Sequence, residues 1–503
     1  MGSTQKIVSG VFWSSITSVI NIIYGFISVP ILLNYFGKGQ YGLIGLACSI
    51  NAYMQLMDMG LNSTNVRFFS SWLATNNHDK IQRGFRTSLS FYMVVGLINS
   101  LILLIVSFFS SSIFNVTLEQ DIVLKKLIYV LVITAFIGWI SSCFDQMVRA
   151  TENVAWTQKR ALIPKSIQVL TLLITIVFKL DILTYFILSS MSFIIVFPIT
   201  IRKIKKEVPF VTFFPQFDKV IFREILPYSL NIFSFSIFQF SFYNLRPVFL
   251  GIQGTVESIV DYNVLMGLFT AVTVIPNTFI SSLLPSVAKV VARHDKESFY
   301  KVAYDGTKYI SIILCACCFG MMALGYDLIS VYVGDKYLFL LPWLYLLLII
   351  TIFVHNQAIS SLILAGDNLR PITYSSIIAS IVGLISVWFL IPKYQAGGVI
   401  SGTGIYQMIQ ISFYYFYYWP CKMNISPKRI FVRCFFPYVL ISVVVLLICQ
   451  IIPSTTHYLN VIIIGLTFAI LYSAIVYFTL NKTDKQFLSS ILPSINIFSW
   501  MKK

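Results

Sequence analysis

Charged side chains are scarce in this chain of 503 residues, at 11% of the sequence, and there are only 4 histidines. A soluble domain carries about 25% charged residues, so the composition excludes an ordinary water-soluble fold. Motifs that need charged or nucleophilic groups are also missing: the sequence has no HExxH, no P-loop and no nucleophile elbow. We therefore predict neither an enzyme nor a cofactor, and the motifs exclude ATP hydrolysis by this chain.

Cysteine is rare as well, and its placement argues against disulfide or metal chemistry. All 8 cysteines fall in or beside apolar segments. The cluster CACC at 315–318 is dense enough for a metal site, but no histidine or carboxylate neighbours it in the sequence. Packing between helices is the favoured interpretation, because small soft side chains suit close helix contacts.

Long apolar runs dominate the rest of the sequence, which is 57% hydrophobic with a mean hydropathy of +0.82. Runs of about 20 residues, the length that lets a helix cross hydrocarbon, recur throughout. The first run is too long for a cleavable signal peptide. We expect an all-α polytopic membrane protein with about fourteen transmembrane helices, at 8–33, 41–65, 87–111, 123–148, 160–179, 181–201, 225–250, 261–286, 308–331, 338–364, 371–392, 396–419, 434–452 and 458–480.

Lysine and arginine give this bundle an orientation. Of the 36 lysine and arginine residues, 29 lie in segments on the N-terminal side of the predicted membrane, and Lys165 is counted among these 29. The opposite side holds six. Arg246 remains, inside a span. The positive-inside rule then places both termini in the cytoplasm. The net charge of +17 is explained by orientation, and no motif predicts a nucleic-acid partner.

A repeated triplet indicates an internal duplication. His-Asp-Lys occurs at 78–80 and again at 294–296, and other matching pairs keep nearly the same offset: Pro30 with Pro247, Gly37 with Gly254, and Asn153 with Asn368. Each pair falls at the same place in the predicted topology, so we interpret the chain as a duplicated six-helix unit. The triplet itself is interpreted as a solvated cytoplasmic loop, in preference to a catalytic group.

The duplication predicts five parts: an N-terminal six-helix lobe at 1–201, a linker at 202–224, a C-terminal six-helix lobe at 225–420, two additional transmembrane helices at 421–480 and a cytoplasmic tail at 481–503. Two lobes of equal orientation are typical of alternating access. The linker is basic and rich in phenylalanine, which favours a position on the membrane surface. The tail, ending in INIFSWMKK, is predicted to lie there too.

Polar side chains are costly in hydrocarbon, yet they line up on three predicted spans. Steps of four and three residues place on one face of the second span Asn51, Gln55, Asp58, Asn62 and Asn65. The first span carries Ser14, Ser18, Asn21, Gly25 and Ser28, and the eighth carries Asn263, Gly267, Thr270, Asn277 and Ser281. Amides beside a carboxylate favour a water-filled face on the second span, whereas the first fits helix packing equally well.

Ionisable groups within the spans are few. Arg246 either binds substrate or extends to the headgroups at the outer surface. His355 is a candidate for ion coupling, because histidine titrates near neutral pH, and a buried neutral histidine is the alternative. We expect Asp145 and Arg149, four residues apart, to form an ion pair at the membrane surface.

Two segments, SVPILLNYFGKGQYGLIGL at 28–46 and LMDMGLNSTNVRFFSSWLATNNHDK at 56–80, resemble the bacterial polysaccharide repeat-unit flippases. These are the O-antigen and capsule exporters of the multidrug/oligosaccharidyl-lipid/polysaccharide superfamily. The resemblance rests on a Gly-x-x-x-Tyr-Gly turn at 37–42 and a Leu-x-Asp-Met-Gly-Leu element at 56–61. It covers the twelve duplicated helices. The chain departs from the family pattern at Asn244-Leu245-Arg246, where members often carry Asp before a basic residue.

The resemblance implies a flippase that moves an undecaprenyl diphosphate-linked oligosaccharide of the O-antigen or capsule type. Movement is from the cytoplasmic to the periplasmic leaflet of a bacterial inner membrane, in contact with membrane lipids and with polysaccharide polymerase machinery. Arg67 or Arg246 would bind the diphosphate. The residues expected to face substrate are Asn21, Asn51, Gln55, Asp58, Asn62, Arg67, Asn244, Arg246, Asn263 and Asn277.

Other functions stay open at this point. The main alternative is a multidrug or lipid-linked peptidoglycan precursor exporter of the same superfamily. A major-facilitator transporter is disfavoured because the loop SWLATNNHDKIQRGF lacks that class's charged motif. A membrane glycosyltransferase or polymerase is disfavoured because the predicted outer loops are too short to hold a catalytic domain.

Overall fold

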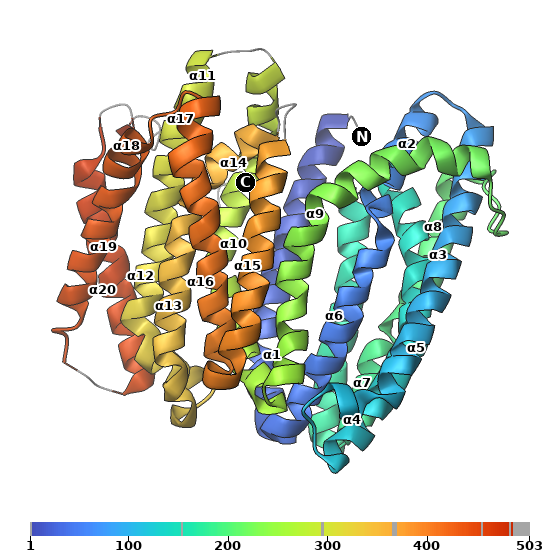
Figure 1. Cartoon of the computed structure of the whole chain (residues 1–503), viewed down its shortest axis with the longest axis horizontal. Coiled ribbons are helices and arrows are strands. Elements are labelled where there is room, and N and C mark those ends of the chain that lie inside the picture. The colour runs from blue at the N-terminus through green and yellow to red at the C-terminus, as the bar shows by residue number, and fades with distance from the viewer. Residues whose placement is uncertain are drawn as a thin grey trace, which may run out of the picture. The chain divides into compact units, whose positions relative to one another are not determined.

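The computed structural model describes residues 3–151, 154–292, 296–364, 370–453, 456–481 and 484–485. Every regular element in these ranges is a helix, as the hydropathy pattern predicts (Figure 1). The all-α prediction is confirmed. Some sequence predictions concern positions outside the described residues: the second triplet at His294, both members of the repeat pair Asn153 and Asn368, and most of the tail, including all of it beyond 485. The side chain of Ser281 is likewise not described.

Ten helices in the described ranges are long and apolar enough to cross a membrane, and a bent pair within α9 makes eleven. The fourteen predicted spans are thus not reproduced one for one. One reason is that α1 (Ser3–Met54) joins the first predicted span to most of the second. Gly37 interrupts it with φ 78° and ψ 166°, a conformation that suits glycine. Figure 1 shows the two arms of α1 running in opposite directions.

The chain divides into two compact units, and the first contains residues 1–270 and 372–409. Its elements are α1, η1 (Gln55–Asp58), α2 (Leu61–Ala74), α3 (His78–Phe108), α4 (Ser110–Ile113), α5 (Leu118–Ala150), α6 (Val154–Phe178), α7 (Ile182–Ser190), α8 (Ser192–Glu207), α9 (Lys219–Gln253), the first part of α10 (Val256–Ala292), α15 (Arg370–Tyr394) and most of α16 (Ala396–Phe413).

The second unit contains residues 271–371 and 410–503. Its described elements are the rest of α10, α11 (Lys296–Lys301), η2 (Val302–Gly306), α12 (Thr307–Tyr332), η3 (Asp335–Leu340), α13 (Leu341–Ile352), η4 (Phe353–Asn356), α14 (Gln357–Leu364), η5 (Tyr414–Tyr418), α17 (Trp419–Lys422), α18 (Pro427–Arg429), η6 (Ile430–Phe435), α19 (Phe436–Cys449) and α20 (His457–Thr479). The arrangement of the chain as two duplicated lobes, with both termini cytoplasmic, remains a prediction.

Local capping explains several helix boundaries in the first unit. Thr117 and Gln120 form a reciprocal capping box at the start of α5, which satisfies backbone N–H groups that the helix leaves unpaired. Asp218 accepts from the backbone of Val220 and Ile221 and so begins α9.

The linker between α8 and α9, residues 208–218, packs against the helices of the first unit. Val208 and Val211 are buried in a hydrophobic core cluster of the unit, and the Phe210 ring stacks on His78 at 4.0 Å. The Asp218 carboxylate accepts from Arg83 at 2.7 Å. Beyond the linker, α9 bends by 59° between its two segments, Lys219–Ser234 and Ile237–Gln253 (Figure 1).

Candidate functional site

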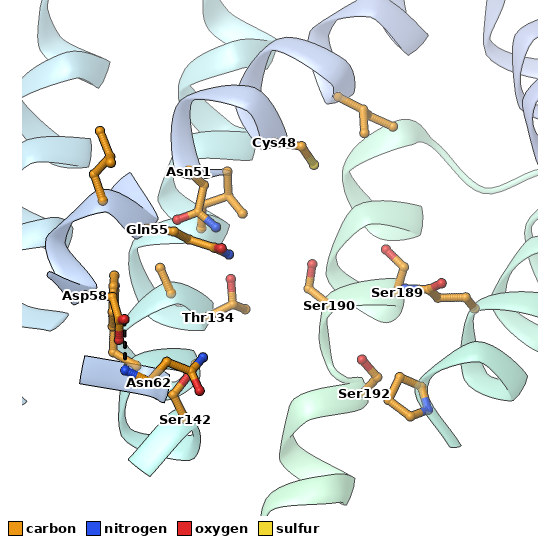
Figure 2. Close-up of a pocket in the computed structure, with 18 of the residues that line it drawn as sticks. Cys48, Asn51, Gln55, Asp58, Asn62, Thr134, Ser142, Ser189, Ser190 and Ser192 are labelled. Atoms are coloured by element: carbon orange, nitrogen blue, oxygen red, sulfur yellow. Dashed lines mark hydrogen bonds between the residues drawn. The ribbon is translucent and has the colours of Figure 1, made fainter. Parts of the chain in front are cut away.

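A polar pocket of about 990 Å³ lies within the first unit. Its walls come from both arms of α1, from η1 and α2, and from α5 to α9. Figure 2 shows two opposing polar groups, with Asn51, Gln55, Asp58 and Asn62 on one side and Ser189, Ser190 and Ser192 on the other. Polar groups are costly in an apolar bundle, so a cluster that opens on a cavity indicates a surface for water or cargo.

The pocket forms where the second predicted span breaks. Helix α1 ends at Met54, η1 tightens into a 3-10 turn, and Met59 and Gly60 adopt φ values of 50° and 77°. A methyl group on Gly60 would come within 2.8 Å of the Ser229 carbonyl oxygen of α9. Glycine is therefore required at this turn, both for its conformation and for the close approach of α9. Broken helices inside a membrane occur where they line a cavity.

Asp58 occupies this break and has a partner for each oxygen. One oxygen accepts from the Tyr92 hydroxyl at 2.5 Å. The other accepts from the Asn62 backbone N–H at 3.0 Å (Figure 2). The carboxylate therefore also caps the first turn of α2, whose positive dipole end favours a negative charge. Asp58 both holds the break together and presents an acid to the pocket.

A chain of buried hydrogen bonds extends from Asp58 into the unit. Tyr92 accepts from the Gln146 amide at 2.8 Å, and the Gln146 carbonyl oxygen accepts from Asn65 at 2.8 Å. All three side chains are at most 1% exposed. The network ties together η1, α2, α3 and α5, and a buried network of this kind is stable only when its members keep their partners. Asn65, predicted on the polar face, therefore serves this network.

Aromatic rings and hydroxyls complete the wall. Among the lining side chains are Tyr24, Tyr41, Tyr185 and Trp139. Thr134 and Ser142 of α5 add hydroxyls (Figure 2). Amides, hydroxyls and aromatic faces are the groups that bind neutral polyhydroxylated molecules, because they supply hydrogen bonds together with flat apolar surface. Asp58 is the one carboxylate among the lining residues described.

Four of the predicted substrate residues, Asn51, Gln55, Asp58 and Asn62, line this pocket. The others lie elsewhere. Asn21 and Arg67 are exposed and are not part of the lining. The Arg67 guanidinium stacks over the Tyr228 ring at 4.0 Å. Whether any of these residues contacts substrate stays a prediction.

Arg246 lies outside the pocket in a cage of aromatic rings. It is 3% exposed, donates to the Thr403 hydroxyl at 2.8 Å, and stands 4.7 Å from the Tyr243 ring and 5.1 Å from the Phe242 ring. Cation–π contacts of this kind stabilise a charge withdrawn from water. Asn244, two residues earlier, donates to the Phe240 carbonyl of its own helix.

Asn263 of α10 packs against Gly45 of α1, so close that a methyl at Gly45 would come within 2.9 Å of its amide nitrogen. In the second unit Asn277 is exposed.

His355, also in the second unit, is 1% exposed, stacks on Phe435 at 4.0 Å and contacts the Tyr415 hydroxyl at 2.7 Å. These contacts favour the buried, structural role for His355, since its polar partners are a hydroxyl and a backbone carbonyl.

One predicted ion pair is wrong. Asp145 binds Arg160 of the neighbouring helix α6, not Arg149. Arg149 is exposed on α5, while Arg160 also donates to Thr200 and thereby joins α5, α6 and α8. A bidentate contact across helices satisfies more donors than a pair along one helix surface.

Metal binding finds no support in the described part of the chain, where no group of three or more His, Cys, Asp or Glu side chains could hold an ion. The cysteines at 315–318 are free thiols on α12.

Two features of the pocket escaped the sequence analysis: the serine wall at 189–192, and Lys165, which contacts two lining residues. A single lysine inside an apolar run was the available signal for the second.

Known structures share this fold. The chain superposes on the lipid II flippase MurJ in an inward closed conformation with a TM-score of 0.74 and 16% identity, covering 93% of this chain and 99% of that one. It also superposes on an inward-facing multidrug resistance MATE family transporter of the MOP superfamily, with a TM-score of 0.59 and 12% identity, covering 87% and 96%. A MOP superfamily transporter from Pyrococcus furiosus superposes with a TM-score of 0.55 and 13% identity, covering 82% of this chain and 94% of that one.

A search of curated protein sequences found no significant match. The model of one family, described as polysaccharide biosynthesis protein, matches residues 7–291. That range is more than half of the 503 residues and contains the pocket with its broken span. It confirms the kind of family that the segments at 28–46 and 56–80 resemble. The chain is a member of the polysaccharide biosynthesis protein family.

Proposed function

We propose that this protein is a flippase for a lipid-linked oligosaccharide repeat unit of the O-antigen or capsule type, carried on undecaprenyl diphosphate. The observation that carries the proposal is the pocket of about 990 Å³, lined by amides, hydroxyls and aromatic rings. Such a lining suits several sugar rings. Membership of the polysaccharide biosynthesis family supports the same class of cargo.

The lipid-exposed surface fits a cargo with a long hydrocarbon tail. Exposed leucine, isoleucine, valine and phenylalanine side chains cover the spans of the first unit, for example Leu101, Ile105 and Phe178. A tail can remain in the bilayer beside this surface while the sugar head occupies the pocket, so that burying the tail in protein is not needed. Alternating access would then carry the head from the cytoplasmic to the periplasmic leaflet of the bacterial inner membrane.

A lipid-linked peptidoglycan precursor is the second candidate cargo, since the chain shares its fold with a lipid II flippase over 93% of its length. A cationic drug fits the pocket less well. Asp58 is the one lining carboxylate described, and both of its oxygens already accept hydrogen bonds. These hydrogen bonds delocalise part of the carboxylate's charge into the protein, and the described lining supplies no second carboxylate to bind a drug cation.

Reconstitution tests the proposal directly. The purified full chain is placed in vesicles that contain a fluorescent undecaprenyl diphosphate oligosaccharide, and a membrane-impermeant reductant reports how much of it changes leaflet. In empty vesicles, the fluorescent lipid in the inner leaflet should stay protected from the reductant. In vesicles that contain the protein, this protected fluorescence should be lost as the lipid moves to the outer leaflet. A matched assay with lipid II and one with a cationic dye separate the alternatives. Movement of the dye alone would contradict the proposal.

A further inference from the structure

Lys165 places a positive charge in a helix that is long and apolar enough to span a membrane. It lies near the middle of the span Ala155–Phe178, directly after Pro164 of the pocket wall. A lysine at the centre of a span costs about 2.5–3.5 kcal/mol on insertion scales. It is too far from the helix ends for full extension of its side chain into the headgroups, so the charge calls for a partner in the protein or in its cargo.

The protein supplies only neutral partners for this charge. The Lys165 ammonium donates to the Gln168 amide oxygen at 2.9 Å and lies 4.4 Å from the centre of the Tyr24 ring. The side chain is half-buried. Within the described ranges no carboxylate forms an ion pair with it. The contacts orient the ammonium but leave its charge unbalanced.

Both partners of Lys165 belong to the pocket. Tyr24 of α1 and Gln168 of α6 are lining residues, and Gln168 follows Lys165 by three positions on the same helix face. The ammonium therefore stands at the pocket wall. Asp58 forms no ion pair with Lys165: its two oxygens accept from the Tyr92 hydroxyl and from the Asn62 backbone N–H. The pocket thus combines a lining of amides, hydroxyls and aromatic rings, with Asp58 as the one lining carboxylate described, and a lysine beside its wall that has no carboxylate partner in the described ranges.

We propose that Lys165 binds the diphosphate that joins lipid to sugar in the cargo, an inference that rests on the function proposed above. An ammonium has three donors. One is committed to Gln168, and two remain for phosphate oxygens. Lysine binds phosphate as a point charge, and a site partly withdrawn from water strengthens that contact. Tyr24 and Gln168 act as positioning residues, because they fix the ammonium before the cargo arrives.

The test uses binding by the purified full chain, followed through tryptophan fluorescence, since Trp139 lines the pocket. The probes are farnesyl diphosphate, farnesol and octyl glucuronide, which separate a diphosphate from a bare tail and from a sugar carboxylate. Wild-type protein should bind farnesyl diphosphate at least about tenfold more tightly than farnesol. Lys165→Gln should remove that preference, and Lys165→Arg should keep most of it.

Lys159 provides the matched control. It lies on the same helix and stacks over an α1 ring, Trp13, at 4.5 Å, but Trp13 is not part of the pocket wall. Lys159→Gln removes an equal charge and an equal kind of contact, and it should leave the diphosphate preference unchanged. Raised salt should weaken farnesyl diphosphate binding in wild type and not in Lys165→Gln.

Each alternative result is informative. Equal diphosphate preference in Lys165→Gln and Lys159→Gln, with both proteins folded, would overturn the role of Lys165 and leave the flippase proposal standing. A preference for octyl glucuronide that depends on Lys165 would assign the cation to a sugar carboxylate and overturn the diphosphate assignment. Wild-type protein that binds none of the three probes and moves no lipid-linked oligosaccharide would overturn both proposals.

Discussion

The Lys38 ammonium lies 2.7 Å from the carboxylate of Asp261, which is 6% exposed. Lys38 follows the break in α1 at Gly37, and Asp261 belongs to the first turns of α10. Just beyond the pair, a methyl group on Gly42 would come within 2.4 Å of the Val256 carbonyl oxygen. An ion pair and a close backbone contact therefore hold the second arm of α1 against α10.

Removing the lysine of this pair should destabilise the protein. Lys38→Ala leaves a buried carboxylate without its cation, and we expect the free energy of unfolding to fall by about 1–3 kcal/mol, less than for a fully buried pair because Lys38 is partly exposed. A lower melting temperature in detergent would report it. Lys203→Ala is the control, because it breaks a pair whose carboxylate, Glu207, is more exposed than Asp261. An unchanged melting temperature in Lys38→Ala would show that Asp261 is satisfied by other means.

Asp58→Asn should impair export more than stability. The amide keeps an oxygen for one of the two hydrogen bonds but loses the negative charge that caps α2 and faces the pocket. Surface polysaccharide should therefore fall in cells that carry normal amounts of the protein in the membrane. Normal polysaccharide in this variant would make Asp58 a packing residue of the broken span.

Tyr92→Phe tests the buried network rather than the pocket. It deprives Asp58 of a donor and Gln146 of an acceptor, both in a site withdrawn from water. We expect a loss of about 1–3 kcal/mol in the free energy of unfolding. The control is Tyr228→Phe, which removes the hydroxyl of a tyrosine in the same unit and keeps the ring that contacts Arg67. The melting temperature of this variant should stay near that of the wild-type protein. Equal melting temperatures in the two variants would contradict a cooperative role for the network.

Arg246 variants separate a structural cation from one that contacts cargo. Arg246→Ala leaves a cavity among Phe242, Tyr243 and Tyr262 and frees the Thr403 hydroxyl. We expect it to lose both thermal stability and export, whereas Arg246→Lys should keep partial export. The sequence-based hypothesis that Arg246 binds the anionic cargo makes a further prediction: a variant of Arg246 that remains stably folded should lose diphosphate binding. Normal export and stability in both variants would rule out either role.

The contact between Arg83 and Asp218 should survive mild acid. The hydrogen bond from Arg83 holds the pKa of the Asp218 carboxyl below its usual value. The stabilisation is therefore fully present above the ordinary aspartate pKa of about 3.9 and is lost only as the pH falls through the lower folded value. Hydrogen exchange of 208–224, corrected for intrinsic rates, should match at pH 7 and pH 5. Asp218→Asn should raise exchange at both values, and a rise in wild type at pH 5 would contradict the assignment.

Periodicity predicted one wall of the pocket well. The steps between Asn51, Gln55, Asp58 and Asn62 are those of a helix, and the structure brings these side chains to one side of a cavity. The break at Met59 and Gly60 shortens that helix without moving its polar face, so the pattern survived. The opposite serines at 189–192 follow no helical period because α7 ends and α8 begins among them, and no periodic pattern could identify them.

Long-range partners were the least predictable part. Asp145 was paired with Arg149 because both lie on one helix, and the true partner, Arg160, belongs to the next helix. The sequence likewise gives no sign that Lys165 of α6 contacts Tyr24 of α1. In both cases the decisive information is which helices are neighbours, and a single sequence does not contain it. The same limit applies to Arg246, whose partner Thr403 is 157 positions away.

The lining of the pocket has a consequence for how this protein would evolve alongside its cargo. Serine, threonine and amide groups can each accept or donate to many hydroxyl arrangements, and they share the task over a wide wall. Exchange of one monosaccharide for another would alter a few weak contacts among many. If the cargo is the lipid-linked oligosaccharide proposed above, its sugar composition could therefore change without a matching change in the pocket.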